Sequence, residues 1–385
     1  MSSGGASNEP GLDTGALRIS FAMATTVGGI GRHVHSLVER LVARGHQIRV
    51  IGPRSVEEEF RFAGTGAAFT PWEVADRPRP LQDLRATLAA RRLLRDVDIA
   101  HAHGVRAGAL IALALIGRRQ PQLVVTLHNA PVRGGWIGAT YDFLEYMVAR
   151  RAGLVSTVSP DLSGRASKRG ARVVERAVIA APHTLPQRGR AAVRAELAAG
   201  QRPIVLAVGR LTQQKGFSTL LEASRRWTDW EPPPLVVVAG EGPLRRELTL
   251  QINAHELPVR LLGRRSDIAD LLTAADVFVL PSLWEGQSLV LQEALRSGCS
   301  IVATAVGGTP DVVGDAALLV PSRDANAIDA AVTSILNNSE LAARLSRAAT
   351  TRAASLPSDE EAVDALLRSY QELPGRGRRG VGRRQ

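Results

Sequence analysis

Short apolar stretches of strand length alternate with helical segments along most of this chain, and this alternation limits the folds that it can adopt. In the first half, the predicted strands cover residues 17–22, 47–51, 97–100, 123–127 and 154–158. The pattern weakens over 185–201, and the strands that follow cover 204–208, 235–239, 259–262, 277–280, 300–303 and 317–320. Strands that alternate with helices form parallel βαβ units. The sequence therefore predicts an α/β fold with two doubly wound, Rossmann-like domains.

The interruption of this pattern sets the predicted domain boundaries. We expect a disordered leader (1–16), a first domain (17–188), a linker (189–202), a second domain (203–356), a helix that crosses back over the first domain (357–373) and a disordered basic tail (374–385). In open parallel sheets, ligands bind beyond the carboxyl ends of the strands. Two such sheets that face each other therefore predict a ligand-binding cleft between the domains.

The chain is strongly basic, because 48 lysine and arginine residues outnumber 37 aspartate and glutamate residues. Nearly all the cations are arginines, and they cluster in the tail from 375 to 385 and in the stretch from 165 to 190. Such clusters attract the anionic face of a membrane or nucleic acid, or they form a solvated surface. No zinc-ligand spacing, helix-turn-helix pattern or basic motif interleaved with aromatic residues is present, so nucleic acid is not an expected partner.

The remaining bulk features favour a cytoplasmic protein. The single cysteine, Cys299, excludes an internal disulfide and fits a reducing compartment. The longest apolar run, 107–116, is much shorter than the roughly 20 residues that span a bilayer. Residues 1–15 lack the basic and apolar regions of a secretory signal. Peripheral contact with the inner, anionic face of the cell membrane is a hypothesis that the arginine clusters leave open.

A strand that ends in glycine introduces the first candidate anion site. The predicted strand 204–208 runs into Gly209 and Arg210, and Lys215 follows five positions later. Glycine lets the backbone approach a phosphate closely, and the Arg210 guanidinium can donate to two phosphate oxygens. Lys215 adds a compact positive charge to the same group. The alternative is that both cations are ordinary surface residues of a loop.

A second candidate site follows at the junction of a loop and a helix. Seven residues separate Glu285 from Glu293, and Ser288 is the predicted N-cap of a helix over 289–297. The free N–H groups and the positive dipole end of such a helix bind anions. Carboxylates beside a phosphate repel it unless they face hydroxyl groups. The two sites together therefore indicate a nucleotide-sugar ligand, and the alternative is an amphipathic helix with two solvated glutamates.

The first domain offers a glycine pair and three histidines. Gly28 and Gly29 lie between the first strand and a helix, where backbone can approach a phosphate, although the full dinucleotide fingerprint is absent. His101 and His103 close one predicted strand and His128 closes another, so we expect these side chains to face the cleft. Each histidine could instead be a hydrogen-bonded residue without a chemical role.

No metal site is predicted. Asp96 and Asp98 form an Asp-x-Asp pattern, but they precede a strand and therefore lie at the wrong edge of the sheet for a cleft ligand. His101 and His103 alternate on one strand face, without a nearby carboxylate or cysteine to complete a zinc set. We therefore expect neither an essential metal nor a cofactor.

Taken together, these residues resemble the retaining glycosyltransferases of family 4 (glycosyltransferase group 1), which have the two-Rossmann-domain GT-B architecture. The similarity covers roughly residues 17–373 and rests on the order and spacing of short motifs. These are Gly28-Gly29, His101-Ala-His-Gly104, Val208-Gly-Arg-Leu with Lys215-Gly216, Gly240-Glu-Gly-Pro243, Leu262-Gly263, the Glu285/Glu293 pair, and the segments 297–303 and 306–310. The resemblance implies that the acceptor binds to the first domain and the nucleotide-sugar to the second, across a shared cleft.

The resemblance also implies a role for each matched residue. Arg210 and Lys215 would hold the donor diphosphate and stabilise the charge of the leaving nucleotide. Glu293 would accept the ribose hydroxyls and Glu285 the hexose hydroxyls, and His103 would lie near the transferred sugar. The expected catalytic residues are thus Glu285, His103, Arg210 and Lys215. The rest of the implied donor site consists of Gly29 and Gly209 at the diphosphate, Gly286, Gln287, Ser288 and Leu289 at the sugar and phosphate, and Gly263 and Arg264 at the base.

The implied reaction is metal-independent transfer of a hexosyl unit with retention, by front-face displacement. The donor would be UDP- or GDP-linked, and the acceptor a glycan, a lipid-linked molecule or a polyol in bacterial envelope or glycan biosynthesis. Gln287 and Ser288 replace an aromatic residue and a glycine that the family often has there, so the sugar specificity does not follow from the resemblance. Alternative interpretations are an epimerase or phosphorylase on the same fold, or a non-catalytic nucleotide- or nucleic-acid-binding protein.

Overall fold

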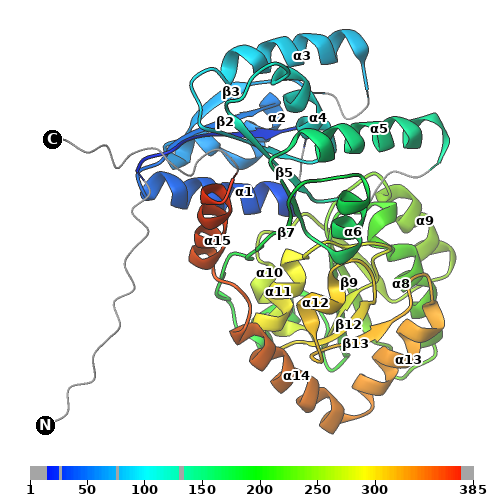
Figure 1. Ribbon diagram of the computed structural model, residues 1–385. Helices are drawn as coiled ribbons and strands as arrows, with labels where there is room; N and C mark the ends of the chain where they lie inside the picture. Colours follow the sequence, from blue (N-terminus) through cyan, green and yellow to red (C-terminus); the bar gives the residue numbers. More distant parts are fainter. Residues whose placement is uncertain (1–14, 26–27, 75–77, 130–133, 374–385) are drawn as a thin grey trace, which may run out of the picture.

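The computed structural model describes residues 15–25, 28–74, 78–129 and 134–373 and arranges them in two α/β domains. Figure 1 shows the first domain in blue to green above the second domain in green to orange, with the last helix in red beside the first domain. The predicted tail, and all but residues 15 and 16 of the predicted leader, lie outside the described residues. Two parallel sheets with helices on both faces confirm the predicted fold class.

Seven parallel strands form the first sheet, in the order β3-β2-β1-β4-β5-β6-β7. The strands are β1 (Arg18–Met23), β2 (Gln47–Gly52), β3 (Ala68–Pro71), β4 (Ile99–His103), β5 (Gln122–Leu127), β6 (Leu154–Thr157) and β7 (Val174–Arg176). The helices of this domain are α1 (Gly29–Ala43), α2 (Arg54–Phe60), α3 (Pro80–Leu93), α4 (Val105–Ala114), α5 (Gly135–Arg151) and α6 (Pro160–Lys168). One apolar cluster joins α3, α4 and α5 to one face of the sheet, and another joins α1 to the opposite face.

Six parallel strands form the second sheet, in the order β10-β9-β8-β11-β12-β13. The strands are β8 (Ile204–Val208), β9 (Leu235–Ala239), β10 (Val259–Gly263), β11 (Val277–Leu280), β12 (Ser300–Thr304) and β13 (Leu318–Val320). The helices are α7 (Arg190–Glu196), α8 (Phe217–Ser224), α9 (Arg245–Ala254), α10 (Ile268–Ala274), α11 (Leu289–Arg296), α12 (Thr309–Val313), α13 (Ala325–Leu336) and α14 (Ser339–Ala354). Two apolar clusters again cover the two faces of the sheet.

The central strands match their predicted bounds most closely. β8 and β9 begin and end where the apolar runs do, and every residue of β9 is at most 1% exposed. A strand buried on both faces is apolar at every position, so its limits can be read from the sequence. The sequence does not predict β3 and β7, because these short edge strands are only partly buried and carry no continuous apolar run.

The prediction for the fourth strand was wrong at its end. Histidine is polar, so the predicted strand stops at residue 100, whereas β4 continues to His103. Its histidines stay in the strand because their rings stack in the sheet core: the centroids of His101 and His103 are 4.4 Å apart, and Phe21 stacks on His103. The two histidines therefore lie within the sheet and do not follow it.

The segment 189–202 is part of the second domain and not a free linker. It contains α7, whose Val193 is buried in the core of the second domain together with Leu197. The predicted crossing helix is α15 (Asp359–Gln371), which packs against α1. Ser36 of α1 donates a hydrogen bond of 2.8 Å to Asp359. A capping box at Ser358 begins α15 and satisfies backbone N–H groups of its first turn.

Candidate functional site

Two adjoining cavities lie between the domains, at the carboxyl ends of the strands of both sheets. The first, called here the Lys215 cavity, has a volume of about 900 Å³ and is lined by the loops after β1, β5, β8 and β11. The second, called the His183 cavity, has a volume of about 960 Å³ and is lined by the loops after β8, β9 and β10 and by α11. Both volumes suit a ligand of drug-like size or larger.

Most of the predicted site residues meet at these cavities. Those lining the Lys215 cavity are Gly29, Gly209, Arg210, Lys215, Arg264, Glu285, Gly286, Gln287, Ser288 and Leu289. Glu293 lines the His183 cavity, which Gly209 and Arg264 also border. Two predicted residues, Gly263 and His103, line neither cavity.

An ion pair between two loops of the second domain forms one wall of the Lys215 cavity. Lys215 Nζ lies 2.6 Å from Glu285 Oε1, which also accepts a hydrogen bond of 2.7 Å from Ser282 Oγ. The loops meet closely because Gly216 has a φ of 65° and leaves no room for a side chain: a Cβ there would lie 2.0 Å from the Pro281 carbonyl oxygen. The pair therefore fixes one cation and one carboxylate side by side in the cavity wall.

A second cation at the same wall has no internal partner. Arg210 is exposed and lines the Lys215 cavity, and its guanidinium pairs with no carboxylate among the described residues. Gly209, the residue before it, leaves space for the Lys215 side chain, because a Cβ would lie 3.2 Å from Lys215 Cδ. One cation is thus held by a carboxylate, and the other is available to an anionic ligand.

Helix α11 begins at the same cavity, since Ser288, Leu289 and Val290 line it together with these cations. Ser288 occupies its N-cap, as predicted, but the Ser288 hydroxyl accepts no capping hydrogen bond. The first N–H groups of the helix are therefore not satisfied by that side chain, and they lie where an anion would meet the positive end of the helix dipole. Gln287 does not reach into the cavity for a ligand with its amide, because Gln287 Nε2 donates to the Ala177 carbonyl of the first domain at 2.7 Å.

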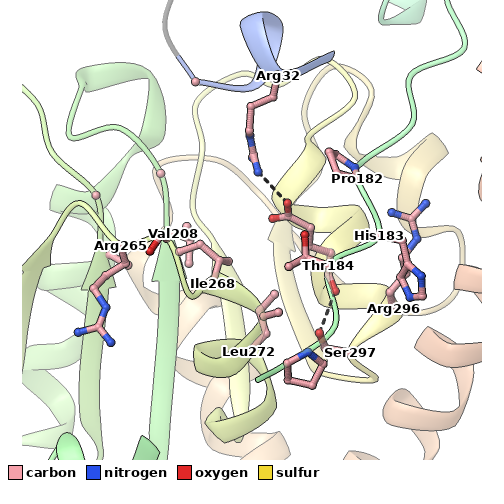
Figure 2. A pocket seen from close by; sticks show the side chains of 18 of the residues that line it. Arg32, Pro182, His183, Thr184, Val208, Arg265, Ile268, Leu272, Arg296 and Ser297 are labelled. Carbon is pink, nitrogen blue, oxygen red and sulfur yellow. Dashed lines mark hydrogen bonds and ion pairs between the residues drawn. The ribbon is translucent and has the colours of Figure 1, made fainter. Parts of the chain in front are cut away.

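Glu293 lies one helical turn further along α11 and is held from the other domain. Figure 2 shows Arg32 entering the His183 cavity from α1, and Arg32 Nη1 lies 2.9 Å from Glu293 Oε1. Glu293 Oε2 is buried and has no hydrogen-bond partner among the described residues. A buried acceptor without a donor is costly, and a ligand hydroxyl would satisfy it.

A second ion pair crosses the cleft beside the first. Arg264 Nη1 lies 3.2 Å from Glu59 Oε2 of α2, and both residues border the two cavities. Arg32 and Glu59 are not among the site residues predicted from the sequence. No local pattern could identify them, since each meets its partner only when the two domains face each other.

The histidines of the first domain form a buried stack that reaches the Lys215 cavity at one end. His128 lines the cavity, and His103 lies behind it, with His103 Nδ1 2.8 Å from His128 Nε2. His101 is deeper still, where its ring nitrogens bond to Tyr370 and Thr126 at 2.7 Å each. The expectation that His103 faces the ligand therefore needs correction: of these three histidines, only His128 lines the Lys215 cavity, which His33 of α1 also borders.

These imidazoles are neutral at physiological pH. Burial lowers the pKa of His128 to about 3, and it lowers the pKa of His101 to about 3 as well. The pKa of His103 lies well below its usual value, because burial and the neighbouring imidazoles both disfavour a charge. The histidine at the cavity is thus suited to hydrogen bonding and not to proton donation.

The Asp-x-Asp pattern lies where the sequence placed it, away from the cavities. Asp98 accepts a hydrogen bond of 2.9 Å from the backbone of Arg18 and pairs with its guanidinium. Within the described ranges, no group of three or more histidine, cysteine, aspartate or glutamate side chains could hold a metal ion.

Comparison with known proteins agrees with this arrangement. The family described as "Glycosyl transferase 4-like domain" matches residues 28–182, and the family described as "Glycosyl transferases group 1" matches residues 190–352. The chain is a group 1 glycosyltransferase. The enzyme is therefore a hexosyltransferase, and its two domains are those of the GT-B fold.

Similar proteins extend over most of this glycosyltransferase. It is 28% identical to a glycogen synthase of Mycobacterium tuberculosis over 376 residues, which cover 86% of this chain and 87% of the relative. It is 27% identical to a phosphatidyl-myo-inositol mannosyltransferase of Mycolicibacterium smegmatis, over 91% of this chain and 92% of the relative. The structure of HepE from Anabaena, in complex with UDP and glucose, shares the fold with a TM-score of 0.80 and 18% identity, over 93% of this chain and all of HepE.

Proposed function

We propose that this glycosyltransferase transfers a hexosyl unit from a nucleoside-diphosphate sugar, with retention of configuration and without a metal ion. The observation that carries the proposal is the convergence of Arg210, Lys215 and the start of α11 on one cavity wall. Two cations and a helix N-terminus suit a diphosphate. The structures of HepE with UDP and glucose support a donor of this class by analogy.

The nucleoside half of the donor would occupy the His183 cavity. The unpartnered Glu293 Oε2 would accept a ribose hydroxyl, while Arg32 holds the other oxygen of the same carboxylate. Ile268 and Leu272 of α10 offer an apolar surface for the base. Gly263, which lines neither cavity, would then contribute only the turn that places Arg264 at the cavity edge.

The diphosphate would lie between Arg210, Lys215 and the N–H groups of Gly286 to Leu289. Cleavage of the sugar–phosphate bond leaves negative charge on the nucleoside diphosphate, and fixed cations at that position stabilise the transition state more than the ground state. The two side chains would thus perform the task that a metal ion performs in other transferases. Gly29, whose chain lies against Leu289 of α11, would bring the first domain to the same phosphates.

The transferred hexose would lie between Glu285 and His128. Glu285 Oε1 is already bound by Lys215 and Ser282, so its remaining capacity suits hydroxyl groups and not nucleophilic attack. His128 would accept or donate one hydrogen bond to the sugar, and His103 would act through His128 by holding its ring. Without a free carboxylate beside the sugar, attack by the acceptor from the face of the departing phosphate is the route that retains configuration.

The acceptor would enter from the first domain. The relatives include a glycogen synthase, a phosphatidyl-myo-inositol mannosyltransferase and a D-inositol 3-phosphate glycosyltransferase of Corynebacterium jeikeium, which suggest a glycan, a lipid-linked molecule or a polyol. A nucleotide-sugar donor and a buried, unpaired Cys299 both fit the cytoplasm.

Ligand-dependent melting tests this proposal. UDP, GDP, ADP and their sugar conjugates are added separately, with and without EDTA, and a ligand that binds only the folded state raises the melting temperature. We expect one nucleoside diphosphate to raise it, equally with EDTA. No shift with any nucleotide would refute the donor, and a shift that EDTA abolishes would refute metal independence.

A turnover assay distinguishes glycosyl transfer from the epimerase and phosphorylase reactions. We expect nucleoside diphosphate to be released only when an acceptor is present, and the anomeric signal of the product to keep the donor configuration. Interconversion of the sugar without acceptor would indicate an epimerase instead. Sugar 1-phosphate formation from a glycan and phosphate would indicate a phosphorylase.

A further inference from the structure

The basic stretch from 165 to 190 is largely neutralised inside the structure. Arg169 pairs with Asp142 at 2.6 Å, and Arg165 pairs with the same carboxylate. Arg188 pairs with Asp270 at 2.9 Å, and Arg190 with a further aspartate. Arg176 pairs with Asp311, so of the seven cations in this stretch only Lys168 and Arg172 have no carboxylate partner among the described residues. The stretch therefore offers a membrane surface much less free positive charge than the sequence suggests.

Exposed apolar side chains gather on one layer of the first domain. Twelve large hydrophobic side chains are exposed in the described part of the chain, and eight of them belong to α3, α4 and α5 or to the residues just after α4. Leu81 of α3 is 76% exposed and Trp136 of α5 is 72% exposed. Single exposed hydrophobic residues are ordinary, but a concentration of this kind marks an interaction surface.

Helical spacing aligns these side chains into two stripes. Leu81, Leu84 and Leu88 follow the i, i+3, i+7 pattern, so they share the outer face of α3. The inner face of that helix buries Ala86 and Ala90 against the sheet. The stripe therefore points away from the protein core.

The same arrangement recurs on α5. Trp136, Phe143 and Tyr146 lie at i, i+7 and i+10, which places them on one face of the helix, opposite the buried Val148. Helix α4 packs between α3 and α5, so all three belong to one layer (Figure 1). We call the two stripes together the docking face.

The charges around the docking face are of one sign. Arg85 and Arg92 are exposed beside the leucines, and Arg150 lies 5.3 Å above the Tyr146 ring. None of these three arginines pairs with a carboxylate among the described residues. The acidic residues of the three helices are all engaged by internal arginines: Asp83 by Arg106, and Asp142 and Glu145 by Arg165 and Arg169.

We propose that the docking face binds the surface of an anionic bilayer, with its leucines and aromatic rings among the acyl chains and its arginines at the lipid phosphates. Apolar stripes flanked by unpaired arginines are the pattern of interfacial membrane helices. No helix of the described residues is long and apolar enough to cross a bilayer, so the contact is peripheral. Binding of this kind requires no donor chemistry, so it can fail or succeed independently of the proposed reaction.

Binding of the docking face to a membrane would also bring the first domain, from which the acceptor enters, to the lipid surface. Helix α5 begins at Gly135, seven positions after His128, which lines the Lys215 cavity. A lipid-linked acceptor could therefore reach the cavity from the membrane surface. This last consequence alone rests on the proposed function.

Sedimentation of the full chain with vesicles tests the docking face. One set of vesicles is phosphatidylcholine, and the other contains equal parts of phosphatidylcholine and phosphatidylglycerol. We expect binding to the anionic vesicles only, reduced by high salt because screening weakens contacts at the surface. Arg85→Gln/Arg92→Gln should weaken the partition coefficient roughly 25-fold, since each arginine near an anionic surface contributes about fivefold.

A pair of apolar variants and matched controls completes the test. Leu84→Ser/Leu88→Ser should weaken binding to the anionic vesicles at least about tenfold. Burial of each leucine side chain among the acyl chains strengthens binding by about that factor. The control Arg246→Gln/Leu250→Ser changes an exposed arginine and a leucine that is 61% exposed on α9, and it should bind like the wild type. Melting temperatures of all variants exclude unfolding as the cause.

Four outcomes would overturn the proposal. Equal binding to neutral vesicles would show that the contact is not specific for anionic lipid. An equal loss of binding in the α9 control would show that it does not depend on the docking face. Loss of binding after replacement of the tail arginines (376, 378, 379, 383 and 384) by glutamine, with none in the α3 variants, would assign the contact to the tail. Concentration-dependent dimerisation in buffer that Leu84→Ser/Leu88→Ser abolishes, without vesicle binding, would assign the docking face to a second copy of the chain.

Discussion

Replacing Lys215 by alanine tests both the chemistry and the stability of the site, because Lys215 is the main partner of a nearly buried carboxylate. The Lys215 side chain is 19% exposed and that of Glu285 is 7% exposed, and their charged atoms are 2.6 Å apart. Removal of one partner of a buried ion pair costs about 3–5 kcal/mol. Since both groups line an open cavity and are not fully buried, we expect Lys215→Ala to lower the free energy of unfolding by about 2 kcal/mol.

A second substitution separates this stability effect from catalysis. In Lys215→Ala/Glu285→Gln the unpaired carboxylate becomes an amide of the same shape, which Ser282 can still hydrogen-bond, so the loss of stability should shrink to under about 1 kcal/mol. Both variants should lose about 100-fold or more in kcat, because a fixed charge at the leaving group is absent in each. Urea midpoints at constant slope measure the first quantity, and release of nucleotide measures the second.

Two results would contradict these expectations. If Lys215→Ala unfolds at the urea concentration of the wild type, the Lys215–Glu285 pair does not stabilise the second domain. If the double variant recovers activity together with stability, Lys215 acts only by holding the loop and not on the leaving group.

Three other perturbations have defined outcomes. Gly286→Ala would place a Cβ 2.4 Å from Val158 Cγ2 of the first domain, so it should hold the domains apart and lower kcat/KM about tenfold or more. Arg32→Gln removes the cross-domain partner of Glu293 and should raise the donor KM about fivefold with little change in kcat, a modest effect because Arg32 is partly exposed. Burial lowers the pKa of His128 to about 3, so the unfolded chain takes up a proton near pH 6.5 that the folded chain excludes. Stability should therefore fall as the pH drops from 6.5 toward 3, by about 1.4 kcal/mol per pH unit for this group.

Each of these has its own control and measurement. Gly164→Ala, where an added Cβ meets nothing within 4 Å, should leave kcat/KM unchanged. A change in kcat with an unaltered donor KM in Arg32→Gln would contradict a role in donor binding. Melting curves of His128→Asn should lose less stability than the wild type on acidification, and an identical slope would show that His128 is not the group that excludes the proton.

The sequence predicted the parts of the site that are local in the chain. Arg210 and Lys215 belong to one loop, and Glu285 and Glu293 flank one loop–helix junction, so their spacing carries the information that places them on the cavity wall. The central strands were predictable for the same reason, because continuous burial of β9 leaves a continuous apolar run. The edge strands β3 and β7 were not, since their partly exposed positions tolerate polar residues.

No local sequence pattern could predict which histidine lines the cavity. His103 and His128 each lie at the carboxyl end of a strand, and nothing in the spacing says which of them reaches the cavity. Side-chain packing decides it: His103 is in contact with Phe21, His101 and His128, and of the two only His128 lines the Lys215 cavity.

The two sheets, their parallel strands and the second-domain half of the site follow from the order of residues, because burial and loop chemistry are recorded position by position along the chain. How the first domain completes the site depends on the packing of the two domains. Arg32 and Glu293 are 261 positions apart and meet solely because the domains face each other. A pairing of that kind depends on the relative placement of two separately folded sheets, which no periodicity or motif within either one encodes.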